Sequence, residues 1–219
     1  MSINTQSVND SYVKRLTVIN SQSVVECRFS GDVAGEILAV CPQVQLSDCE
    51  VSSGRVNYGG RIICTAVYAD SRGKLTRAQK GAEFTHYADD DLLAPAQTAI
   101  CSLACEKASV RRDGTAFIVA AVITARITVY GNAERCYVTS AEGAVCRTEN
   151  VKFCNVQTFS GESEVEDDFE AANVADILMH DAKAITTDCR CGAGEIQISG
   201  DIYLSMLAIR GDEPVALDR

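Results

Sequence analysis

The residues of this chain best suited to chemistry are its cysteines. Two close pairs occur, Cys101-x3-Cys105 and Cys189-x-Cys191, and neither has the C-x2-C spacing typical of zinc sites and thioredoxin-like redox motifs. We therefore expect no metal site and no cofactor. The odd total of eleven indicates either buried, reduced thiols or later oxidation with at least one intermolecular bond. The cysteines are at positions 27, 41, 49, 64, 101, 105, 136, 146, 154, 189 and 191.

Disulfide cross-linking between chains is the chemistry that these cysteines favour. Cys189 and Cys191 are the first candidates, because residues i and i+2 of an extended segment point to the same face. We expect them to lie together beside the edge of a neighbouring chain. Cys64 falls on a core-facing position of a predicted strand, where a cysteine acts as a small apolar residue. The sequence leaves the connectivity open, and the further candidates are Cys49, Cys41, Cys101 and Cys105.

Catalysis has few residues to use. His86 and His180 are the only histidines, and neither lies in a recognisable motif with a cysteine nucleophile. The acidic run at residues 161–170 lacks the glycine-punctuated spacing of a calcium loop and is predicted to be a solvated linker. Phosphate-binding glycine loops are absent. We expect no catalytic residues and no enzyme, unless scattered residues, such as carboxylates around His86, form a site that no motif reveals.

Composition and charge narrow the possible partners. Hydrophobic residues make up 47% of the 219 residues and charged residues 23%, as in an ordinary globular protein. A formal net charge of −10 disfavours nucleic acid and anionic membrane surfaces as partners. The N-terminal residues show no apolar segment of a secretory signal, so we expect synthesis in the cytoplasm. The longest apolar run, residues 116–125, is too short to span a bilayer and is predicted to be a buried strand.

The chain repeats part of its own sequence at a constant offset of 140 residues. Glu36-Ile37-Leu38 and Asp176-Ile177-Leu178 start two segments that align without a gap. Upstream similarity begins near Val13 in the first copy and Val151 in the second. We therefore predict a complete unit at residues 13–150 and a second, half-length copy at 151–219. Matching pairs include Cys49 with Cys189, Gly54 with Gly194, Gly60 with Gly200 and Ile62 with Ile202.

The pattern of apolar residues predicts strands. Val56, Tyr58, Ile62, Cys64 and Ala66 alternate along one face of a strand of about a dozen residues, and the pattern returns at residues 115–130 and 195–209. Turns are expected at residues 53–54, 131–132 and 142–143, and only 33–38 and 171–178 look briefly helical. The predicted fold is all-β, mainly antiparallel and sandwich-like, with edges that other chains could extend.

Several segments in a fixed order resemble a known family. The sequence from about Val13 to Ala216 is similar to the SPOCS domain of spore-coat morphogenesis and spore-envelope proteins in spore-forming bacteria. The resemblance implies a protein without enzymatic activity. The segments are EILAV (36–40), DCEV (48–51), GRVNYGGRI (54–62), EFTH (83–86), ITVYG (127–131), ADIL (175–178) and GEIQISGDIYL (194–204).

Two hypotheses follow from the resemblance and the cysteines together. In the first, the chain is a structural protein of the spore coat or exosporium, made in the mother cell without a signal peptide and deposited on the spore surface. It would assemble with itself, and with other coat proteins, through β-edge contacts and intersubunit disulfides. In the second, it is a monomeric adaptor that binds a morphogenetic partner at the forespore surface. Symmetry and lattice type are not encoded in any recognisable motif.

Overall fold

The secondary structure of the chain is entirely β in the part that can be described. A computed structural model describes residues 3–30, 36–145, 147, 149–150, 152, 155–159, 161–168, 170, 173–211 and 213–219. Nine strands and no helix occur within these ranges, which confirms the predicted all-β class. The strands are β1 (Asn4–Phe29), β2 (Ile37–Ser52), β3 (Arg55–Ala69), β4 (Leu75–Asp89), β5 (Thr98–Asp113), β6 (Ala116–Glu142), β7 (Val174–Cys191), β8 (Ile196–Arg210) and β9 (Glu213–Asp218).

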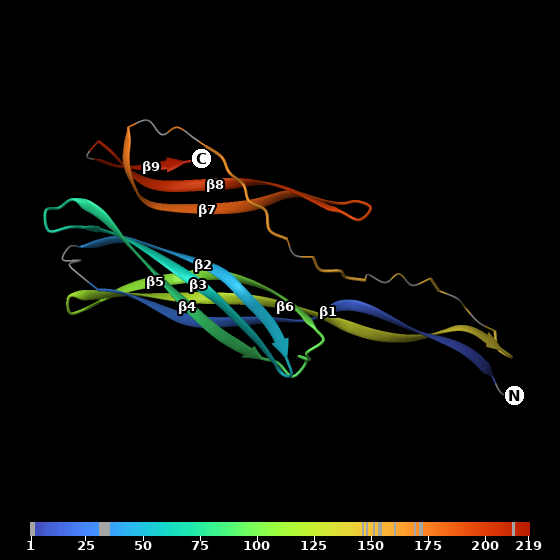
Figure 1. Ribbon diagram of the computed structural model, residues 1–219. Helices are drawn as coiled ribbons and strands as arrows, with labels where there is room; N and C mark the ends of the chain where they lie inside the picture. The colour runs from blue at the N-terminus through green and yellow to red at the C-terminus, as the bar shows by residue number, and fades with distance from the viewer. Residues whose placement is uncertain are drawn as a thin grey trace.

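The strands form three antiparallel sheets of three strands each (Figure 1). Sheet A has the order β1-β6-β5, sheet B has β2-β3-β4, and sheet C has β7-β8-β9. Sheets A and B pack face to face, which is the predicted sandwich. The edge strands β2 and β5 approach each other along one side of the sandwich, and β1 and β4 approach along the other.

The core of the sandwich follows from the alternation of apolar residues in β3 and β6. Ile62 and Tyr58 on β3 are fully buried, as are Phe117 and Ile123 on β6 of the opposite sheet. Burying one such side chain contributes roughly 1.5–3 kcal/mol. Phe117 also stacks on Phe29 of β1 with ring centroids 4.4 Å apart. The sandwich is therefore held together by the face that the period-two pattern predicts.

Strand β6 runs through a segment that was expected to turn. Gly131 pairs with Lys14 of β1 inside the ladder, so the turn predicted at residues 131–132 is wrong. A Cβ at Gly131 would lie 2.6 Å from Leu16 Cδ1, so the glycine makes room for a side chain instead of reversing the chain. Beyond it, residues 4–14 and 131–142 form a two-stranded ribbon that extends past the sandwich (Figure 1).

The two brief helices predicted at 33–38 and 171–178 are also wrong for the residues described. Ile37 and Leu38 begin β2, and residues 174–178 begin β7, while 31–35 and 171–172 lie outside the described residues. Each strand start carries a β-bulge, between Ile37 and Ala39 and between Ile177 and Met179. A bulge inserts one residue into the ladder and breaks the alternation on which strand prediction depends.

Sheet C repeats the hairpin of β2 and β3. The bulges recur at the offset of 140, as does the shift between Leu46 and Asp48, which returns between Thr186 and Asp188. The connecting turns carry Gly54 and Gly194 at φ values of 72° and 87°, a conformation that favours glycine. The internal repeat predicted from sequence is therefore also a repeat of backbone geometry.

Where it is described, the segment that leads to sheet C lies outside the strands and is largely exposed. Asn155 accepts a hydrogen bond from the Val13 N–H at 2.8 Å, and the Val156 N–H donates to the Val13 carbonyl at 3.0 Å. The segment's described residues between 145 and 158 belong to no strand. The acidic residues 161–168 are exposed and lie outside any strand, as expected of a linker. In the described parts of the chain, no helix has the length and apolar character needed to cross a bilayer.

Candidate assembly site

The candidate cysteines Cys189 and Cys191 lie at the end of β7 on an exposed sheet face. In the ladder Cys189 is paired with Ile198 and Cys191 with Ile196, which places the four side chains on one face. Both cysteines are exposed, and Ile198 is 66% exposed. We call these four residues, with Ile202 further along β8, the open face. Its thiols are thus accessible and next to apolar side chains.

The first copy of the repeat shows the same sheet face in a buried state. The counterparts of Ile198 and Ile202 in the first unit are Tyr58 and Ile62, and both have no exposed surface. In sheet B this face is packed against sheet A. In sheet C, Ile202 is 52% exposed, although Met206 further along β8 is buried. The open face therefore corresponds to a core surface that lacks its cover.

The open face also adjoins an incompletely paired strand. Strand β4 pairs with β3 from Arg55 to Ala69, whereas β9 pairs with β8 only from Ser205 to Arg210. Leu204 adds a pair of backbone hydrogen bonds with Arg219 at 2.8 Å. No described strand pairs with that side of β8 between residues 196 and 203. Unpaired backbone groups at a sheet edge can accept another strand.

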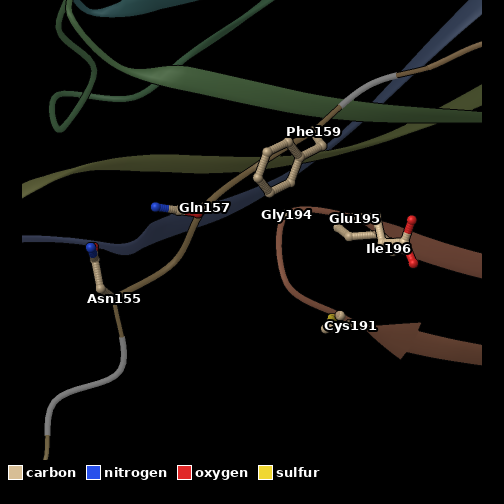
Figure 2. A pocket seen from close by; sticks show the side chains of 8 residues that line it. Asn155, Gln157, Phe159, Cys191, Gly194, Glu195 and Ile196 are labelled. Atoms are coloured by element: carbon tan, nitrogen blue, oxygen red, sulfur yellow. The ribbon is translucent and has the colours of Figure 1, made fainter.

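A groove lies between the open face and the linker that precedes sheet C. Figure 2 shows Phe159 of the linker above the turn that contains Gly194, with Cys191 at the other end of the turn. The groove has a volume of about 540 Å³, and its lining includes Ile196. Phe159 is 71% exposed. The apolar surface around the two cysteines thus continues onto the linker.

The other four candidate cysteines lie along the side of the sandwich where β2 meets β5, which we call the β2–β5 seam. Cys41 and Cys49 belong to β2, and Cys101 and Cys105 belong to β5. All four are half-buried. Cys49 and Cys101 are close enough for their thiols to influence each other, and so are Cys41 and Cys105. These candidates therefore face one another within one chain.

The cysteine pairs differ in their acidity. The neighbouring Cys101 thiol lowers the pKa of Cys49, because it stabilises the Cys49 thiolate, and the same interaction raises the pKa of Cys101. Burial, followed by the neighbouring Cys27 thiol, raises the pKa of Cys64 far above its ordinary value. Of Cys49 and Cys101, Cys49 is thus better able to form a thiolate, the nucleophilic form of the side chain.

The remaining cysteines divide into three kinds. Cys27 and Cys64 are buried in the core, in keeping with the apolar role predicted for Cys64. Cys136 is exposed on the two-stranded ribbon and was not among the cross-linking candidates. Its neighbours Glu134 and Arg135 were a signal of exposure in the sequence. Cys146 and Cys154 lie outside the described residues.

The two histidines make ring contacts and a link between sheets. His86 lies edge-on to the Tyr58 ring and beside Tyr87, with both centroid distances at 5.7 Å. The carbonyl of His180 accepts a hydrogen bond from Gln43 Nε2 at 2.9 Å, which links sheets B and C. Over the described residues, no three His, Cys, Asp or Glu side chains come together in a group that could hold a metal ion.

Comparison with known proteins adds no relative. The sequence matches no protein-family model, and searches of the curated proteins and of the solved structures give no match either.

Proposed function

We propose that this chain is a non-enzymatic structural protein of the bacterial spore coat or exosporium, and that copies of it join through strand edges and intersubunit disulfides. One observation carries the assembly part of the proposal: exposed Cys189 and Cys191 lie on an apolar face beside an edge of β8 that no described strand pairs with. The location on the spore rests on the resemblance to the SPOCS domain. Both parts can be tested separately.

The edge of β8 favours a strand from another chain as its partner. Residues 196–203 offer backbone donors and acceptors that their counterparts in β3 use to bind β4. A second copy brings suitable edges of its own, since β7 and β9 border sheet C and β1 borders the ribbon of sheet A. Addition of a strand to an exposed edge is a common mode of protein association.

The apolar side chains supply the driving force, and the thiols make the contact permanent. Covering Ile196, Ile198 and Ile202 removes apolar surface from water. The cytoplasm keeps thiols reduced, so the disulfides would form after the mother cell releases the spore into an oxidising medium. Synthesis in a reducing compartment and later cross-linking outside it are therefore compatible.

Oxidation of the purified full chain tests the assembly. With glutathione disulfide as the oxidant, we expect disulfide-linked oligomers on non-reducing gels and ordered assemblies by electron microscopy. The double variant Cys189→Ser/Cys191→Ser should lose most of the linked species, while Cys41→Ser/Cys105→Ser should keep them. If the gels show only monomer and electron microscopy shows no assemblies, the proposal is contradicted.

A substitution on the open face separates packing from cross-linking. Ile198→Lys should weaken association under reducing conditions, measured by light scattering, because it places a charge on the apolar contact. Val24→Lys is the matched control, since Val24 is 63% exposed on β1 of the first unit and Ile198 is 66% exposed. Equal association of the two variants would show that the open face is not the contact.

Location is tested with a tagged copy in a sporulating bacterium. We expect the tag on the spore surface after mother-cell lysis. A chain that stays monomeric when oxidised, yet is held at the forespore by one other protein, would favour the adaptor hypothesis instead. A tag spread through the mother cell would contradict both.

A further inference from the structure

The second group of cysteines, at the β2–β5 seam, lies where the sandwich has no backbone hydrogen bonds between its sheets. Strands β2 and β5 are edge strands of different sheets, and they approach each other without forming a ladder. Cys49 lies on β2 and Cys101 on β5, and both pack against the same core cluster, which includes Tyr58 and Ile127. A covalent bond between them would tie sheet A to sheet B.

The geometry points to an intramolecular disulfide site formed by Cys49 and Cys101, which closes when the protein meets a low-molecular-weight disulfide. The two side chains pack against one core cluster from opposite sheets and are close enough to influence each other. Both are half-buried, so part of each side chain is open to solvent. This assignment goes beyond the proposed assembly, and it differs from the intersubunit role expected of these two residues from sequence.

The reaction is a thiol–disulfide exchange in two steps. The thiolate of Cys49 attacks one sulfur of the oxidant RSSR, forms a mixed disulfide and releases RS⁻, which takes up the proton lost by Cys49. The sulfur of Cys101 then attacks the Cys49 sulfur of the mixed disulfide, and the second RS⁻ leaves and takes the Cys101 proton. The protein loses two electrons and two protons, and RSSR becomes two molecules of RSH.

The order of attack follows from the opposite effects that the two thiols have on each other. The neighbouring Cys101 lowers the pKa of Cys49, whereas the pKa of Cys101 is raised, so Cys49 is the better thiolate and reacts first. Once Cys49 is in the mixed disulfide, Cys101 no longer has a thiolate to stabilise and is beside its target. The pair thus contains an attacking and a resolving cysteine.

The core pair Cys27 and Cys64 provides an internal comparison. These thiols are also neighbours, but Cys27 is 1% exposed and Cys64 has no exposed surface. A soluble disulfide cannot reach them in the folded sandwich. We therefore expect them to stay reduced under conditions that oxidise Cys49 and Cys101.

The repeat gives a second comparison. Cys189 is the counterpart of Cys49 in sheet C, yet no described strand stands opposite it as β5 stands opposite β2. The same position of the repeat is therefore closed within the chain in the first unit and open to another chain in the second. Under this inference, Cys49 forms a disulfide within the chain because β5 lies opposite it, and Cys189 is left to form one with another chain.

Peptide mapping of the oxidised full chain tests the site. Trypsin places Cys49 in residues 29–55 and Cys101 in 81–107, and these peptides also contain Cys41 and Cys105. The Cys41→Ser/Cys105→Ser variant is therefore oxidised with glutathione disulfide, alkylated and digested. We expect the two peptides to be linked, and the link to disappear when Cys49→Ser or Cys101→Ser is added.

Two further measurements separate this site from intersubunit linkage. In a mixture of ¹⁵N-labelled and unlabelled copies, an intrachain bond gives linked peptides that are either fully labelled or unlabelled. Oxidation of Cys189→Ser/Cys191→Ser should raise the Tm by roughly 5–10 °C, as expected of a disulfide in a protein of this size. Free thiols at Cys49 and Cys101, separate glutathione adducts on both, or links of mixed label would overturn the assignment.

Discussion

Gly60 and Gly200 occupy the same point in two copies of one hairpin. A Cβ built at Gly60 would lie 2.4 Å from the Gln45 carbonyl oxygen, and one at Gly200 would lie 2.3 Å from the Ile185 carbonyl oxygen. Gln45 and Ile185 are themselves separated by the offset of 140 residues. The close approach of backbone to glycine, at a shift in register beside a bulge, is therefore a property of the repeat unit.

Alanine at either glycine should push the neighbouring strand away. Because the atom in the way is backbone, we expect Gly60→Ala to lower the free energy of unfolding of the sandwich by about 1–3 kcal/mol, the usual cost of overpacking. Gly200→Ala should instead loosen sheet C, detected as faster amide exchange in β7 and β8. Gly161→Ala, where a Cβ meets no atom within 4 Å, is the control. A neutral Gly60→Ala would contradict the packing described for β2 and β3.

Ile62 and Ile202 allow the cost of an uncovered face to be measured directly. Ile62 has no exposed surface and Ile202 is 52% exposed at the repeat-equivalent position. We expect Ile62→Ala to destabilise the monomeric chain by about 2–5 kcal/mol in denaturant unfolding, because it leaves a cavity. Ile202→Ala should change it by no more than about 0.5 kcal/mol, as at an ordinary surface position. Comparable losses would mean that the open face is covered in solution.

Tyr58 should make the sandwich sensitive to alkaline pH. Burial raises the pKa of the Tyr58 phenol, against an opposing contribution from its hydrogen bond to Ser21 Oγ at 3.0 Å. A group whose pKa is higher folded than unfolded contributes stability below the unfolded value, about 10, and that stability is lost as pH rises through the folded value. We expect stability to fall above about pH 10.

The control for this effect is Tyr58→Phe. Loss of the hydrogen bond should cost about 1 kcal/mol near neutral pH. The variant should nevertheless show a shallower alkaline decline in the free energy of unfolding than the parent chain. Parallel pH profiles for the two proteins would show that Tyr58 does not cause the decline.

Cys49 should be alkylated faster than the other cysteines of the β2–β5 seam. At pH 8 the lowered pKa of Cys49 gives it more thiolate, while burial raises the pKa of Cys105 and reduces its thiolate. Iodoacetamide labelling followed by peptide mass spectrometry compares their rates in one sample. We expect Cys101→Ala to slow the labelling of Cys49 severalfold, because the thiol that lowers the pKa of Cys49 is gone. An unchanged or faster rate would contradict the influence of Cys101 on Cys49.

The sequence alone determined the class of fold and the repeat. Alternating apolar residues such as Val56, Tyr58 and Ile62 encode a two-faced strand locally, and an offset of 140 residues reveals a copied hairpin without any structure. The helix predicted up to Leu38 is wrong because a bulge interrupts the alternation there. The turn predicted at Gly131 is wrong because, in sequence, a glycine that makes room for Leu16 looks the same as one that turns the chain.

Only the tertiary structure decided which cysteines meet. Cys49 and Cys101 belong to different sheets, and their contact depends on how two sheets stack, a long-range outcome that spacing along the chain does not contain. The exposure of Cys189 was decided in the same way: its strand resembles that of Cys49, but no sheet covers it among the described residues. Local sequence sets the pattern of each strand, whereas packing between sheets determines what each face can do.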